Sequence, residues 1–224
     1  MAIDEALSYP FNEDRWIETM AIGTILKKLS FLVVPWILLQ GYYTAVMRAT
    51  MAGRDHPPEF EEWGRLFVDG LKASTVHAVY FLVPFVAFAV LVVPSLLAMV
   101  RGELAAGFSG MIFGLAVSLV LFAISLYVAM AGHVAFAHTG RLRDAFGLEM
   151  VRLAASREYL VAFVMAKLVL TGVGSVKAVV AGIPGVHFVL ILLVPFLVKY
   201  ALTVNSRLYA EAGASVLSRT TTGR

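Results

Sequence analysis

A short run of acidic residues between two apolar stretches is the first candidate for chemistry in this chain. It contains Glu61, Glu62 and Asp69, with Trp63 among them. Carboxylates used in general acid–base catalysis work beside a nucleophile or a metal ion, and neither a nucleophile nor metal-spaced histidines accompany this run. No catalytic residue is therefore predicted, and the acids indicate either a structural anchor or a platform for a ligand or partner.

The histidines do not predict a metal site. His133 and His138 are five residues apart, which puts them on different faces of a helix, whereas a helical metal pair has a spacing of four. The chain has no cysteine, which excludes disulfides, thiolate chemistry and Cys-based metal sites. Phosphate-binding and dinucleotide-binding fingerprints are also absent. We therefore expect neither a metal nor another cofactor.

Two lysines, Lys167 and Lys199, lie inside apolar runs. An ionisable residue at such a depth is a functional candidate, because a charge in the bilayer is costly. The long stem of lysine also allows the ammonium group to reach the membrane surface. Two interpretations follow: both lysines snorkel to the surface, or they contact a solute or anion inside the membrane.

The elements that position these residues are predicted to be membrane helices. Hydrophobic residues make up 60% of the 224 residues and charged residues 15%, against about 45–50% and about 25% in soluble domains. We therefore expect an all-α integral membrane protein. The net charge of +3 comes from few charges and does not indicate nucleic-acid binding. The acidic N-terminus lacks the pattern of a cleaved signal peptide.

Apolar runs predict a polytopic bundle of five transmembrane helices. Each run is close to the roughly 20 residues that a crossing needs. The five runs are 29–47, 74–100, 105–131, 159–180 and 185–208. A shorter run at 16–28 ends in Lys27 and Lys28 and predicts an interfacial helix, although a hairpin across 16–48 would give six crossings. The domain prediction is one membrane domain over 1–224, with residues 1–28 as tail and interfacial helix, 29–208 as the bundle and 209–224 as a flexible tail.

Small residues on one face of the third run predict a close helix contact. Gly107, Gly110, Gly114 and Ser118 recur at helical spacing, and side chains of this size let two helix backbones approach closely.

Residues 57–72 predict a short amphipathic helix on the membrane surface. Pro57 and Pro58 suit a first helical turn. Phe60, Trp63 and Phe67 then recur at spacings of three and four and form one apolar stripe, which we expect in the bilayer interface. A similar helix is predicted at 141–155, and its Arg141, Arg143 and Arg152 are expected to face anionic lipid.

Positive charges in the short loops predict the orientation. Arginines and lysines gather after the first and third runs, and cytoplasmic loops carry such an excess. We expect a multi-pass protein of the cell membrane with the long loops and the C-terminus in the cytoplasm. Five crossings would place the N-terminus outside, and six would return it to the cytoplasm.

Three motifs of the N-terminal part are "YPF…W" from Tyr9 to Trp16, "GYYTAVMR" from Gly41 and "PPEFEEWGRLFVDGLK" from Pro57. They resemble an uncharacterised family of polytopic membrane proteins, domain of unknown function 4013, found mainly in archaea and some bacteria. The strong resemblance covers residues 9–80, and the rest of the chain is similar only in pattern. The adjacent Lys27 and Lys28 depart from the family pattern. The resemblance implies a protein with several membrane helices and supplies no activity, cofactor or site.

These observations favour a non-enzymatic membrane scaffold or accessory subunit that binds a partner or lipid headgroups through its cytoplasmic interfacial helices. The expected partners are the lipid bilayer and either another membrane protein or a second copy of the chain. The alternative is a small transporter or channel with a broken-helix site near Lys167, Gly172 and Pro195.

Overall fold

The computed structural model describes residues 3–181 and 187–221, and every element in this part of the chain is helical. The α-helices are α1 (Ile3–Ser8), α2 (Trp16–Lys28), α3 (Val33–Met51), α4 (Trp63–Val100), α5 (Leu104–Thr139), α6 (Leu148–Ala154), α7 (Arg157–Ala181) and α8 (His187–Thr221). Two short 3-10 helices are η1 (Tyr9–Phe11) and η2 (Leu142–Phe146).

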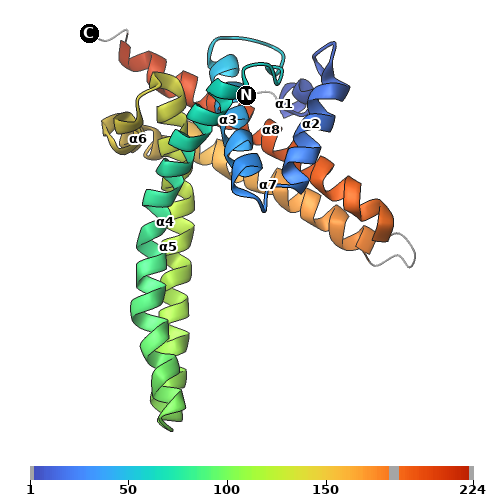
Figure 1. Cartoon of the computed structure of the whole chain (residues 1–224). Coiled ribbons are helices and arrows are strands. Elements are labelled where there is room, and N and C mark those ends of the chain that lie inside the picture. The colour runs from blue at the N-terminus through green and yellow to red at the C-terminus, as the bar shows by residue number, and fades with distance from the viewer. Residues whose placement is uncertain (1–2, 182–186, 222–224) are drawn as a thin grey trace.

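Helices α4 and α5 form one antiparallel hairpin and α7 and α8 another (Figure 1). Helix α3 packs against α4 and α8, and α2 packs against α8. The α4/α5 hairpin extends far from the rest of the molecule, and α7/α8 diverges from it at a wide angle. The loop at 52–62, the start of α4, helices α1 and α6 and the end of α8 lie together at the opposite end from the α4/α5 turn. We call this end the polar end.

Three helices of the described part are long and apolar enough to cross a membrane. They are α4, α5 and residues Arg157–Val180 of α7, each of which contains an 18-residue stretch with a mean hydropathy of 2.6, 2.5 and 1.8, respectively. This confirms the helical class and the presence of helices able to span a membrane, whereas the further crossings at 29–47 and 185–208 stay predictions. At 1.5 Å per residue, the 38 residues of α4 extend for about 57 Å, well beyond the roughly 30 Å of a hydrocarbon core.

A separate surface helix at 57–72 is not formed. Residues 57–62 are non-helical, and α4 begins at Trp63 and continues to Val100 with Pro84 and Pro94 inside it. Adjacent prolines disfavour helical backbone in the residue before each of them, so the helix starts later than predicted. Residues 73–83 contain no glycine or proline that would end the helix after Lys72, and the predicted surface helix and membrane span are one element. The predicted 141–155 helix is likewise two elements, η2 and α6.

The prediction of a flexible tail at 209–224 is wrong as far as Thr221, because α8 continues to that residue. Tyr209, Ala212 and Leu217 are buried. A Cβ atom at Gly213 would lie 2.6 Å from a side-chain atom of Val134. The small side chains that suggested a loose tail instead allow α8 to pack closely on α5. Residues 222–224 lie outside the described residues.

The predicted small-residue face of α5 does pack closely. A Cβ atom at Gly107 would lie 2.2 Å from Met99, one at Gly110 would lie 2.6 Å from Ser95, and one at Gly114 would lie 3.0 Å from α4. The distal half of the hairpin is therefore held together by the close approach of the α5 glycines to backbone and side-chain atoms of α4, and its large apolar side chains face outward. Phe85, Ile112 and Phe113 are among the exposed ones.

Candidate functional site

An ion pair at the polar end joins three helices. The Arg48 side chain, near the end of α3, donates to both carboxylate oxygens of Asp69 in the second turn of α4, and its Nη2 lies 3.2 Å from Oδ1. Arg48 Nε also donates to the backbone carbonyl of Ala137 on α5 at 3.2 Å. Asp69 is only 8% exposed. Loss of either partner would leave the other charge in a site with little solvent, which destabilises the folded protein.

Two glycines allow this ion pair to form. A Cβ atom at Gly41 would lie 1.8 Å from the carbonyl oxygen of Leu66, and one at Gly70 would lie 1.9 Å from that of Ile37. Helices α3 and α4 therefore cross in direct backbone contact. Arg48 lies about two turns beyond Gly41 on α3, which brings its side chain to the Asp69 face of α4.

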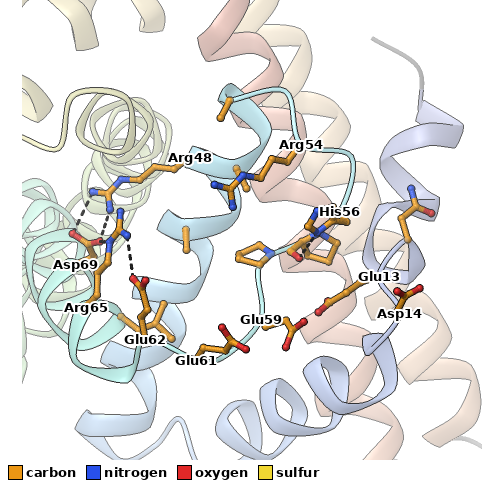
Figure 2. A pocket seen from close by; sticks show the side chains of 17 residues that line it. Glu13, Asp14, Arg48, Arg54, His56, Glu59, Glu61, Glu62, Arg65 and Asp69 are labelled. Carbon is orange, nitrogen blue, oxygen red and sulfur yellow. Dashed lines mark hydrogen bonds and ion pairs between the residues drawn. The ribbon is translucent and has the colours of Figure 1, made fainter.

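A cavity of about 630 Å³ lies beside the ion pair, between α3, the 52–62 loop, the start of α4 and residues 12–14. Its wall is mostly charged, and Figure 2 shows these side chains around one space. The ionisable residues that line it are Glu13, Asp14, Arg48, Arg54, His56, Glu59, Glu61, Glu62, Arg65 and Asp69. Small apolar residues complete the lining, including Ala45, Ala49, Pro57 and Pro58.

The N-terminal segment forms one wall of the cavity because it is bonded to the 52–62 loop. The hydroxyl of the buried Tyr9 donates to the carbonyl oxygen of His56 at 3.1 Å. Asn12 Nδ2 donates to the carbonyl oxygen of Asp55 at 3.3 Å. Arg15 forms an ion pair with Glu59 at 2.8 Å. These contacts join segments more than forty residues apart, which is why the sequence did not indicate the cavity.

Glu13 is the least satisfied carboxylate of the cavity. It is 9% exposed, its Oε1 accepts from Thr19 at 3.4 Å, and its Oε2 is buried with no hydrogen-bond partner in the described part of the chain. Burial raises the pKa of Glu13, the Thr19 hydroxyl opposes that rise, and the nearby Glu59 carboxylate adds to it. In Figure 2 the carboxyl groups of Glu13 and Glu59 point toward one another.

The predicted acidic residues lie at this cavity. Asp69 forms the central ion pair, Glu62 pairs with Arg65 at 3.0 Å on the exposed surface, and Glu61 is exposed at the rim. Sequence reasoning did not select Glu13, Arg48 or Arg54. Arg48 had one visible signal, an arginine directly after the apolar run 29–47, but its partner could not be identified from spacing.

The predicted aromatic stripe is divided between the interior and the surface. Phe60 is buried and stacks on Tyr42 with ring centroids 4.2 Å apart, so its expected place in the bilayer interface is wrong. Its apolar face is covered by α3 because the 57–62 segment folds back over that helix. Trp63 and Phe67 are exposed on α4, and their contact with lipid remains a prediction.

The two lysines differ from one another. Lys199 is fully buried, its Nζ donates to Thr203 at 2.9 Å and lies 4.0 Å from the centroid of the Tyr42 ring, so the snorkelling interpretation is wrong for this residue. Its stem occupies the space that a side chain at Gly23 would need. Lys167 is half-buried, with Nζ 4.7 Å from the Phe163 ring centroid. Neither lysine lines the cavity at the polar end.

The predicted basic residues lie on the surface of a different part of the polar end. Arg141, Arg143 and Arg152 are exposed on and beside η2 and α6, and Arg143 lies 3.5 Å from Asp144. Their contact with anionic lipid remains a prediction. Within residues 3–181 and 187–221, no group of three or more His, Cys, Asp or Glu side chains is arranged to hold a metal ion.

Residues 29–193, well over half of the chain, match the model of a family described as "Protein of unknown function (DUF4013)". The chain belongs to this family. The match contains the α3/α4 crossing, Arg48, Asp69 and the whole α4/α5 hairpin, but it begins after the Tyr9–Trp16 motif and after Glu13. It extends far beyond Tyr80, where the strong resemblance of the sequence was expected to end. Searches of curated proteins and of solved structures each found no match.

Proposed function

We propose that the protein is a non-enzymatic membrane scaffold or accessory subunit whose polar end binds a partner. The observation that carries this proposal is the cavity of about 630 Å³, whose walls come from four separate segments and are fixed by ion pairs and backbone hydrogen bonds. A preformed cavity binds with less loss of conformational entropy than a loop that must become ordered.

Membrane helices support the scaffold part of the proposal. The α4/α5 hairpin places exposed apolar residues along its distal half, where lipid would surround them, and leaves the charged cavity at the other end. The exposed arginines on η2 and α6 lie at that same end and would contact anionic headgroups. The transporter alternative has no observation in its favour, because the Lys167 ammonium group packs on Phe163 and the described cavities are lined by other residues.

Site-specific photo-crosslinking in intact membranes tests the proposal. A photoreactive amino acid is placed at Ala52, an exposed residue of the cavity lining, and in a matched protein at Arg101, beside the α4/α5 turn. We expect a discrete protein adduct at position 52, identified by mass spectrometry as the same polypeptide in repeated preparations, and none of that mass at position 101. The proposal is wrong if position 52 gives only lipid adducts or the same adducts as position 101.

Headgroup contact is tested separately by native mass spectrometry of the purified protein. Replacing Arg141, Arg143 and Arg152 together with glutamine should reduce retained anionic phospholipid several-fold. A matched protein with glutamine at Arg54, Arg65 and Arg101 controls for the loss of three charges. Equal lipid retention by the two proteins would contradict the proposed lipid surface.

A further inference from the structure

The charges around the cavity at the polar end are not balanced. Six carboxyl groups and three guanidinium groups line it. Asp69 and Glu62 are neutralised by Arg48 and Arg65, and Glu59 by Arg15, which approaches from outside the lining. Glu13, Asp14 and Glu61 have no ion-pair partner within the described residues, and among the lining arginines only Arg54 is likewise unpaired.

Glu13 provides an observation independent of this charge count. The side chain is more than nine-tenths buried, lines the cavity and keeps one carboxylate oxygen without a partner. A buried carboxylate oxygen without a hydrogen-bond partner costs free energy in the folded protein. The raised pKa of Glu13 has the same cause, and a cation beside the carboxylate would lower it again.

We propose that the cavity binds a lysine or arginine side chain presented by a segment of a partner protein. This rests on the proposed scaffold function and specifies the chemistry of the partner. The carboxylates of Glu13 and Glu61 accept from the cationic head group. The small apolar lining at Ala45, Ala49 and Pro57 accommodates the methylene stem, which packs against apolar surface while its charge is paired.

Alternative occupants fit less well. A bare metal ion would need several ligands around one point, and the described residues contain no group of three suitable side chains. An anion would meet one unpaired guanidinium group, that of Arg54, on the opposite side of the cavity from Glu59 and Glu61 (Figure 2). An organic cation on an apolar stem meets three unpaired carboxylates.

The binding of a fluorescent tetralysine peptide to the full chain in mild neutral detergent tests this inference, with fluorescence anisotropy as the readout. Matched tetra-arginine and tetraglutamate peptides are measured in parallel. Three variants are compared with the unmodified protein: Glu13→Gln, Glu61→Gln and the control Glu103→Gln, which removes an exposed carboxylate beside the α4/α5 turn. Each has its folding checked by thermal unfolding.

We expect tetralysine or tetra-arginine to bind and tetraglutamate not to bind. Glu13→Gln and Glu61→Gln should each weaken binding by about fivefold to tenfold, because each removes one charge-assisted contact. Glu103→Gln should leave the affinity unchanged. If Glu13→Gln fails to fold, the comparison of Glu61→Gln with Glu103→Gln decides the result, since both residues are on the surface.

Two results overturn the inference. One is the absence of binding by both cationic peptides, and the other is equal affinity in the Glu61→Gln and Glu103→Gln proteins. Photo-crosslinking from position 52 distinguishes this failure from a failure of the scaffold function. If a specific protein adduct forms but the cationic peptides do not bind, the scaffold function is supported and the binding of a cationic side chain is contradicted. If neither a specific protein adduct nor binding of a cationic peptide is observed, both proposals are wrong.

Discussion

The distal half of the α4/α5 hairpin and the polar end use the same packing device in two different surroundings. In the hairpin, Gly107 and Gly110 bring α5 against α4, and the larger side chains turn outward as apolar surface. At the polar end, Gly41 and Gly70 bring α3 against α4, and charged side chains surround a cavity. Small residues determine how closely the helices approach, whereas the outward side chains determine which solvent or ligand the surface suits.

The crossing at the polar end is predicted to be the less tolerant of the two. In Gly41→Ala the new Cβ atom would meet a backbone carbonyl that cannot rotate away, and we expect a loss of about 3 kcal/mol or more in the free energy of unfolding. In Gly110→Ala the nearest atom is the Ser95 hydroxyl, which can rotate, so the loss should be smaller. Thermal unfolding in detergent and elution on size exclusion measure both. Gly64→Ala, with open space around the new Cβ, is the control. Equal losses of unfolding free energy in Gly41→Ala and Gly110→Ala would contradict the expected difference between the two helix contacts.

A charge on the outward face should be costly only in the hairpin. Ile112 is exposed in the third turn of α5, and if lipid surrounds this position Ile112→Arg should cost up to about 2.5–3.5 kcal/mol, the cost of a charge at the centre of a membrane helix. Leu148→Arg, at an equally exposed position of α6 at the polar end, is the control and should have little effect. A glycosylation-reporter assay of membrane insertion measures the difference. Full insertion of the Ile112→Arg protein would show that water, and not lipid, surrounds this part of the hairpin.

Removing one member of the central ion pair should also destabilise the protein. Asp69→Ala leaves Arg48 without its partner, and because Arg48 is partly exposed we expect about 2–3 kcal/mol, below the range for a fully buried pair. Glu62→Gln breaks the exposed pair with Arg65 and should cost under about 0.5 kcal/mol. Denaturant unfolding gives both values. Similar losses of unfolding free energy in Asp69→Ala and Glu62→Gln would show that the Arg48–Asp69 ion pair does not stabilise the polar end more than an exposed pair does.

The smallest expected effect is a dependence of stability on pH at Glu13. Burial raises its pKa above the usual 4.5, so ionisation is disfavoured in the folded protein. Stability is complete below the unfolded-state pKa and is lost as the pH rises through the folded-state pKa. Glu13→Gln should therefore unfold at a higher temperature than the unmodified protein at about pH 8 and at the same temperature at about pH 4. Asp14→Asn, at an exposed position, should show no such difference. A pH-independent effect of Glu13→Gln would contradict a buried ionisable group.

Local patterns predicted the helical class and part of the packing. The glycine spacing of α5 is a property of one helix, so the close approach to α4 followed from it. The Phe60, Trp63 and Phe67 stripe shows the limit of such patterns. A helical spacing of apolar residues indicates that one face of the segment is apolar. Such a face can pack either against other aromatic side chains or against lipid, so the spacing could not predict that Phe60 stacks on Tyr42 inside the protein.

Only part of the candidate site could be predicted, because local spacing does not show which distant segments come together. Glu61, Glu62 and Asp69 were identifiable because they interrupt apolar sequence, which makes polar residues conspicuous. Arg48 and Glu13 join them through contacts that span more than twenty residues or separate helices. Snorkelling and solute contact were the two interpretations of Lys199, and its burial inside the protein was not predicted, because nothing in its own helix indicated the space that Gly23 leaves for it.

By itself, the sequence determined the helical class, the presence of helices able to span a membrane, the family, and the glycine face of α5. Composition and local spacing are sufficient for the helical class and this glycine face, because a helix in lipid satisfies its own backbone hydrogen bonds, and the motifs indicated the family. Only the tertiary structure decided that Arg48 and Asp69 form one ion pair, that Glu13 keeps an unpaired oxygen in a charged cavity, and that α8 continues as far as Thr221. These features depend on which distant segments meet, and on the water that their contact excludes.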